Sequence, residues 1–200
     1  MQQVPQSQFL SMARLMGFGE KMEIAPGISA AEGTLPALKS LKNQRALANF
    51  SFGQGDLTAT PLQISAMVNA IASGGLYTQP YLYEGIVDEK QEFVEKAETK
   101  EQKRVMTEQT AALLQEFMVE SVENGTSKRG KPERGGAAAK TATAQTGKFV
   151  GEKELVQSWF AGYFPKENPK YVITVFEDGG KGGGITCAPV FKEIADALNA

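Results

Sequence analysis

The chain has 200 residues, of which 42% are hydrophobic and 22% charged, and its formal net charge is −2. This balance is typical of a globular domain and excludes a disordered chain or a strongly basic polyanion binder. Histidine is absent and Cys187 is the single cysteine, which excludes thiolate or imidazole zinc sites, Ser-His-Asp triads and intrachain disulfides. Nucleophilic chemistry would need a lysine, tyrosine or carboxylate as its base.

The first predicted element is an amphipathic helix over residues 5–16, with Gly17 at the position just past its end. Its apolar face consists of Phe9, Met12, Ala13 and Met16. Residues 18–48 lose this periodicity and contain several prolines and glycines. They predict a long connection with at most short helical turns.

Thr60 and Pro61 give the clearest helix start in the chain, because threonine is a good N-cap and proline suits the first helical position. The predicted helix ends at Gly74 and Gly75. Its buried face consists of Ile64, Met67, Val68 and Ile71. Residues 77–100 then predict an extended stretch followed by a charged turn region.

A further helix is predicted over residues 107–123, with Asn124 and Gly125 at its end. Its inward face consists of Leu114, Phe117, Met118 and Ser121. The basic, glycine-rich residues 126–136 predict a mobile loop. The spacing over residues 125–131 is similar to that of a phosphate-binding loop, but Pro132 stands where such a loop needs serine or threonine, so we expect no nucleotide site.

The last third changes to strand periodicity. Strands are predicted over residues 137–145, 155–164 and 171–176. The connections over 146–154 and 165–169 are too short for a crossover helix, so the strands should form an antiparallel meander.

A final helix is predicted to begin at Pro189, after a flexible hinge over residues 179–184. Its buried face consists of Phe191, Ile194, Ala195 and Leu198. Helices followed by a three-strand sheet and a covering helix predict an α+β, or mixed α/β, fold. We expect a mainly helical part over residues 1–125 and a sheet with the C-terminal helix over residues 137–200.

The first predicted strand carries the segment with the most chemical interest. Alternation divides it between two faces, with Lys140, Ala142 and Ala144 on one and Thr141, Thr143 and Gln145 on the other. By itself, a threonine-rich strand with one lysine is typical of an ordinary sheet edge. The segment also resembles the Lys-Thr-Gly-Thr strand of penicillin-binding proteins and serine β-lactamases.

The chain resembles the transpeptidase domain of class B penicillin-binding proteins along nearly its whole length. Besides Lys140 to Gln145, the segments that match in order are Gly17-Phe18-Gly19, Pro26-Gly27, Gly33-Thr34-Leu35-Pro36, Gly53-Gln54-Gly55, Thr60-Pro61-Leu62-Gln63, Asn124-Gly125-Thr126, Trp159-Phe160-Ala161-Gly162-Tyr163 with Pro165, and Ala188-Pro189-Val190-Phe191. Each segment alone is a weak marker, whereas the ordered set is specific. The resemblance implies a partial penicillin-binding-protein transpeptidase fold.

Two signatures of the family are missing. Its members attack with the serine of a Ser-x-x-Lys motif, and a Ser-x-Asn motif assists proton transfer. None of the ten serines here has lysine three residues later or asparagine two residues later. We therefore expect both motifs upstream of residue 1 and a chain that is inactive alone. A second hypothesis is a non-catalytic module, derived from that fold, that binds peptides or partners.

The resemblance implies acyl transfer from D-Ala-D-Ala stem peptides to an amine, through a serine ester, in cell-wall cross-linking. Lys140 and Thr143 are the expected catalytic residues, supplying positive charge and one N–H donor of the oxyanion hole. The expected substrate-binding residues are Lys140, Thr141, Ala142, Thr143 and Gln145, with the threonine hydroxyls on the terminal carboxylate. Ala142 replaces the family's glycine, and its methyl group should weaken β-lactam affinity.

The resemblance also implies partners and a location. The parent protein should bind a stem peptide or a β-lactam, need no metal or cofactor, and bind no nucleic acid. It should lie outside the cytoplasmic membrane on an N-terminal anchor. The chain itself has no signal peptide and no stretch near 18 apolar residues, so we expect it to be soluble and free of membrane contact. An uncovered edge at strand 171–176 should allow a homodimer or a domain swap.

Overall fold

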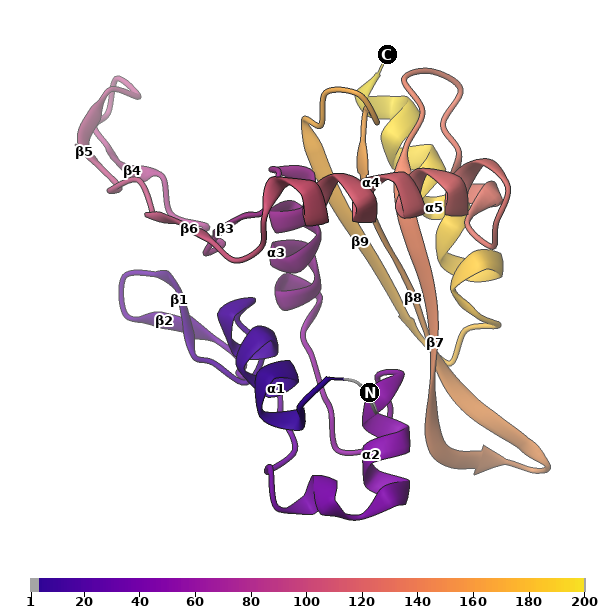
Figure 1. The fold of residues 1–200 in the computed structure, drawn as a ribbon. Helices are drawn as coiled ribbons and strands as arrows, with labels where there is room; N and C mark the ends of the chain where they lie inside the picture. The colour runs from indigo at the N-terminus through magenta and orange to yellow at the C-terminus, as the bar shows by residue number, and fades with distance from the viewer. Residues whose placement is uncertain (1–3, 200) are drawn as a thin grey trace.

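A computed structural model describes residues 4–199. Its centre is an antiparallel sheet in the order β7-β8-β9, formed by β7 (Ala138–Val150), β8 (Lys153–Phe164) and β9 (Tyr171–Asp178). Helices α3 (Pro61–Ala72) and α4 (Glu108–Glu123) cover one face, and α5 (Gly183–Leu198) covers the other (Figure 1). The predicted α+β class and antiparallel meander are confirmed. Within residues 4–199, no helix is both long and apolar enough to span a bilayer.

The N-terminal part is more ordered than its sequence predicts. It contains α1 (Gln6–Leu15), the hairpin of β1 (Met22–Ala25) and β2 (Ile28–Ala30), a 3-10 turn (Ser40–Lys42) and α2 (Gln44–Ser51). The prediction of a long connection was wrong, because strands this short show no periodicity. The buried residue of α1 is Leu10, whereas Phe9 is partly exposed and makes an edge-to-face contact with Phe50.

Residues 76–104 form an arm that projects away from the sheet (Figure 1). It consists of two short antiparallel pairs, β3 (Leu76–Thr78) with β6 (Gln102–Arg104) and β4 (Gly85–Val87) with β5 (Phe93–Lys96). The sequence predicted the extended stretch, whereas the charged region after it contains a second hairpin rather than a simple turn. The next segment, residues 126–136, contains a 3-10 turn (Lys128–Gly130), and Lys131 pairs with Glu123 of α4.

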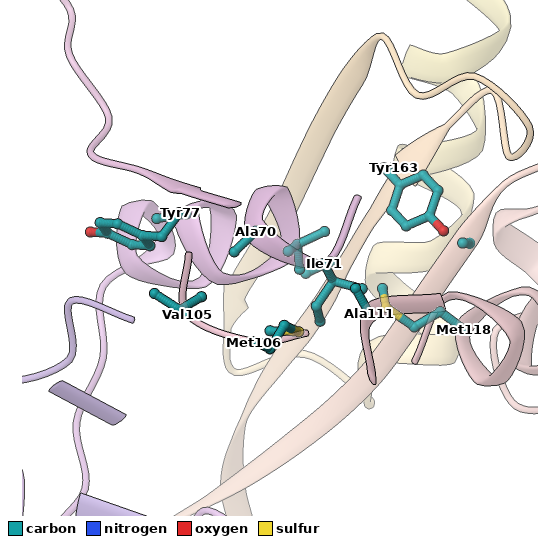
Figure 2. Close-up of a cluster of buried hydrophobic side chains, with 12 residues drawn as sticks. Ala70, Ile71, Tyr77, Val105, Met106, Ala111, Met118 and Tyr163 are labelled. Carbon is teal, nitrogen blue, oxygen red and sulfur yellow. The ribbon is translucent and has the colours of Figure 1, made fainter. Parts of the chain in front are cut away.

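The largest core cluster lies where α3 and α4 meet the sheet and the root of the arm (Figure 2). Val68 and Ile71 of α3 are buried as predicted, and Ile64 and Met67 are half-buried. Helix α4 buries Ala111, Met118 and Val122. The predicted burial of Phe117 was wrong, since its side chain is 61% exposed. One residue along a helix is a rotation of about 100°, so the neighbour of a buried methionine can face solvent.

Two predictions for the last third need correction. Strands β7 and β8 continue through the predicted connection and leave only a turn at Gly151 and Glu152, because the bulge between Gln145 and Phe149 disguises the strand alternation. Helix α5 begins at Gly183, so Pro189 lies inside it.

The predicted inward face of α5 was partly wrong. Cys187, Phe191 and Ala195 are buried at a spacing of four residues. Ile194 and Leu198 are 38% and 47% exposed, because they lie away from this stripe.

Gln63 is the buried polar side chain that joins α3 to the N-terminal part. Its side-chain amide donates to the carbonyls of Gly17 at 2.8 Å and Glu32 at 2.7 Å. Its Oε1 accepts from the Thr60 N–H at 2.9 Å, and Thr60 Oγ1 accepts from the Gln63 N–H, which completes a capping box. The predicted helix start at Thr60 and Pro61 is confirmed.

We predict that Gln63→Ala lowers the free energy of unfolding by about 3 kcal/mol, since one buried carbonyl, one partly buried carbonyl and one partly buried N–H lose their partner. Urea denaturation measures the loss. Gln8→Ala, at an exposed position of α1, is the control and should stay within about 0.5 kcal/mol of wild type. Equal losses in the two variants would contradict the role of Gln63.

Candidate functional site

The Lys-Thr-x-Thr segment lies in β7, at the edge of the sheet. Across β8, Lys140 faces Ala161, Ala142 faces Trp159 and Thr143 faces Ser158. Within residues 4–199, no strand pairs with the outer edge of β7. Such an edge can accept an extended peptide through main-chain hydrogen bonds.

The outer edge carries the main-chain groups of Thr141 and Thr143. The Thr141 carbonyl accepts from Lys140 Nζ at 2.6 Å, and the Thr143 carbonyl is 3.5 Å from Gln54 Nε2. Neither carbonyl therefore points toward β8. In an antiparallel strand, the N–H and carbonyl of one residue point to the same side. The Thr143 N–H accordingly also points outward, where an incoming oxygen can reach it.

The two threonine side chains lie on the face of the sheet that α5 covers. Thr141 Oγ1 lies 3.0 Å from Thr126 Oγ1, and a Cβ on Gly182 would lie 3.3 Å from Thr143 Oγ1. Hydroxyl groups can donate to a carboxylate, so this face offers anion contacts. Thr126 was not among the predicted site residues, although Asn124-Gly125-Thr126 was recognised as a family segment.

Lys140 and Ala142 lie on the opposite face, and both side chains are exposed. Among the described residues, no carboxylate oxygen lies within 4.0 Å of Lys140 Nζ, so its charge remains available to a ligand. Trp159, across from Ala142, packs against Phe176 with 4.4 Å between the ring centroids. The Ala142 methyl group therefore stands beside an aromatic pair.

Gln145 is held apart from the threonine hydroxyls. Its Nε2 donates to Glu154 Oε2 at 2.9 Å, and Glu154 Oε1 accepts from the Gly147 N–H at 3.0 Å. Both bonds brace the bulge in β7. Gln54, in contrast, reaches the outer edge from a loop far along the chain, although the sequence did not place it in the site.

Glycines allow the start of α5 to lie directly against the strand. A Cβ on Gly183 would lie 1.9 Å from the Trp159 carbonyl oxygen and 2.8 Å from that of Ala142. Neither backbone oxygen can move away without breaking the sheet. The glycine-rich segment over residues 179–184, which the sequence predicted to be a flexible hinge, therefore packs against the strand beneath Ala142 and Thr143.

Comparison with known proteins finds relatives over most of the chain. The model of the family described as penicillin binding protein transpeptidase domain matches residues 1–196. The chain is 31% identical over 159 residues to peptidoglycan D,D-transpeptidase PbpA of Mycolicibacterium smegmatis, covering 76% of this chain and 32% of that protein. It therefore spans about a third of the length of that curated relative.

Solved structures show the same fold. Penicillin-binding protein A of Mycobacterium tuberculosis, as a ceftriaxone acyl-enzyme complex, matches with a TM-score of 0.82 and 27% identity over 94% of this chain and 42% of that one. Penicillin binding protein 3 of the same organism, complexed with aztreonam, matches with a TM-score of 0.81 and 25% identity over 98% and 46%.

Proposed function

The chain belongs to the penicillin binding protein transpeptidase domain family, and we propose that it forms the Lys-Thr-x-Thr side of the active-site cleft in a peptidoglycan D,D-transpeptidase. The free outer edge of β7 carries this proposal, because it presents the Thr143 N–H beside the Lys140 ammonium. Residues 1–200 would be the C-terminal portion of the domain, with a mainly helical part over 1–125 and the sheet with α5 over 137–200.

The proposed reaction is acyl transfer. A serine outside these 200 residues attacks the carbonyl carbon between the two D-alanines of a stem peptide, and its proton passes to the terminal D-alanine, which leaves as an amine. A second amine then attacks the ester carbonyl carbon, the bond from that carbon to the serine oxygen breaks, and the amine's proton passes to the serine oxygen. The Thr143 N–H stabilises the oxyanion in both steps, a contact that typically contributes a factor of about 10²–10³ in rate.

Side chains of this chain would bind the C-terminal carboxylate of the stem peptide. The hydroxyls of Thr141 and Thr143 donate to the carboxylate, and Lys140 supplies positive charge on the other face of the strand. Thr126 joins them through its contact with Thr141. Gln145 acts from a distance, by bracing the bulge at the end of this segment. A β-lactam carries the same carboxylate and would use the same contacts.

The remaining proposals concern location and assembly. We place the parent protein outside the cytoplasmic membrane, where peptidoglycan is built, with an anchor beyond this chain. Within residues 4–199, the outer edge of β9 has no strand partner. An unpaired edge favours pairing with a second copy, as a homodimer or a domain swap.

The first test is covalent labelling by a penicillin. The 200-residue chain should show no mass increase, because it lacks a Ser-x-x-Lys nucleophile, whereas the complete protein should gain one adduct. Intact-mass spectrometry measures both. Stoichiometric labelling of the chain alone would contradict the assignment of the nucleophile, and an unlabelled complete protein would favour a non-catalytic peptide-binding module.

A second test concerns the alanine in the motif. In the complete protein, Ala142→Gly should speed acylation by a penicillin by roughly 3- to 10-fold. Removal of the methyl group relieves a steric contact with the bound penicillin, which lowers the activation free energy by about 1 kcal/mol. Ala144→Gly, two residues along on the same face, is the matched control and should not speed it. Equal rates for wild type and Ala142→Gly would show that the methyl group is tolerated.

A third test concerns the β9 edge. Light scattering of the 200-residue chain at high concentration should give twice the 21.5 kDa mass of one copy. Phe176→Lys should shift the chain toward the monomer, since a charged side chain on an edge strand opposes pairing. Phe117→Lys, which makes the same change at an exposed phenylalanine of α4, serves as the charge control. A wild-type chain that stays monomeric would refute the proposed dimer.

A further inference from the structure

We infer that Ser158 is a positioning residue for Thr143: its buried hydroxyl holds the Gly180–Gly183 segment against the strand and thereby fixes the carboxylate-binding side chain. The inference rests on the proposed function, because it assigns Thr143 to the terminal carboxylate. Ser158 itself would not touch the substrate, since its side chain is 0% exposed.

The first step is the pairing of Ser158 with Thr143. The two residues lie directly opposite each other on β8 and β7. Because the Thr143 carbonyl points to the outer edge, the pair exchanges no main-chain hydrogen bonds, and such pairs bring their side chains closest together. Both side chains therefore lie next to each other on the face that α5 covers.

The second step is the bond from Ser158 to the segment before α5. The Gly182 N–H donates to Ser158 Oγ at 2.8 Å, and Cys187 Sγ donates to the Ser158 carbonyl at 3.3 Å. A Cβ on Gly180 would lie only 2.4 Å from Ser158 Oγ. A buried hydroxyl costs free energy unless it is hydrogen-bonded, so Ser158 and Gly182 depend on each other.

The third step leads from Gly182 back to Thr143. Gly182 has a φ of 114° and a ψ of 147°, a conformation that residues other than glycine rarely adopt. In this conformation, a Cβ at Gly182 would lie 3.3 Å from Thr143 Oγ1. The segment that Ser158 holds therefore presents a surface close to the Thr143 side chain. Without the bond, that surface can withdraw and the hydroxyl can turn away from a carboxylate.

Thr186, in the first turn of α5, provides a matched control. Its Oγ1 accepts from the Lys181 N–H at 2.9 Å, a bond that joins the segment before α5 to α5 itself rather than to a strand. Thr186→Val and Ser158→Ala each remove one side-chain acceptor from one glycine-rich segment. Only Ser158→Ala removes the link to the sheet.

The experiment compares the variants in the complete protein, with benzylpenicillin and its methyl ester as probes. Ser158→Ala should slow acylation by benzylpenicillin by about 10- to 100-fold, as expected for a displaced binding group, and Thr186→Val should change it by no more than about twofold. The ester lacks the carboxylate charge, so Ser158→Ala should slow its reaction far less. Equal slowing with acid and ester would indicate a merely structural role and overturn the inference.

A measurement on the 200-residue chain separates this inference from the proposed function. By NMR, Ser158→Ala should shift the side-chain resonances of Thr143 and make the Gly182 amide exchange at least about 10-fold faster, whereas Thr186→Val should do neither. A complete protein that no penicillin acylates would refute the proposed function only. Unchanged Thr143 resonances in Ser158→Ala would refute the positioning role.

Discussion

The register between β7 and β8 is the constraint on which the rest of the site depends. A slip by one residue would turn Lys140 toward α5 and the threonines toward the opposite face. The register requires a residue without a side chain at position 162. A Cβ on Gly162 would lie 2.5 Å from the Ala138 carbonyl oxygen and 2.5 Å from the Ala139 Cβ. Close packing of small residues thus determines which groups of the Lys-Thr-x-Thr segment lie at the outer edge and on each face of the sheet.

Buried polar side chains then tie the surrounding loops to the sheet and to α3. Three such residues are fully buried among those described: Gln63, Ser127 and Ser158. Gln63 holds two N-terminal loops to α3. Ser127 Oγ lies 2.8 Å from Ser121 Oγ and 3.5 Å from the Ala139 carbonyl, which brings the loop that carries Thr126 to the strand. Since each bond satisfies groups that burial would otherwise leave unpaired, the loops are supports rather than mobile links.

The sequence predicted the parts of the fold that local chemistry specifies. The helix start at Thr60 was found because a capping side chain and a following proline mark it, whereas the helix after Thr107 was found from the spacing of its apolar residues, and the structure shows a capping side chain there too. The start of α5 was missed because Gly182 has no side chain with which to cap it, and tertiary packing on the sheet stabilises that turn instead. The sequence likewise identified Lys140 to Thr143 as a motif because these residues are consecutive. It did not identify Ser158, because only the pairing of β7 with β8 places Ser158 opposite Thr143.

At Ala142, the stability of the strand competes with the space that a bound substrate would need. Glycine within a strand costs roughly 0.5–1 kcal/mol relative to alanine, because it loses more backbone entropy on folding. The alanine thus stiffens an edge strand that has neighbours on one side only, at a position where its methyl group would occupy volume of the proposed cleft. The gain in folding stability and the proposed penalty for acylation are each about 1 kcal/mol, which is the usual balance between stability and activity at a binding site. This balance matters most for a site on a sheet edge. The edge strand must remain unpaired to receive a substrate, yet it must keep its extended conformation when no substrate is bound.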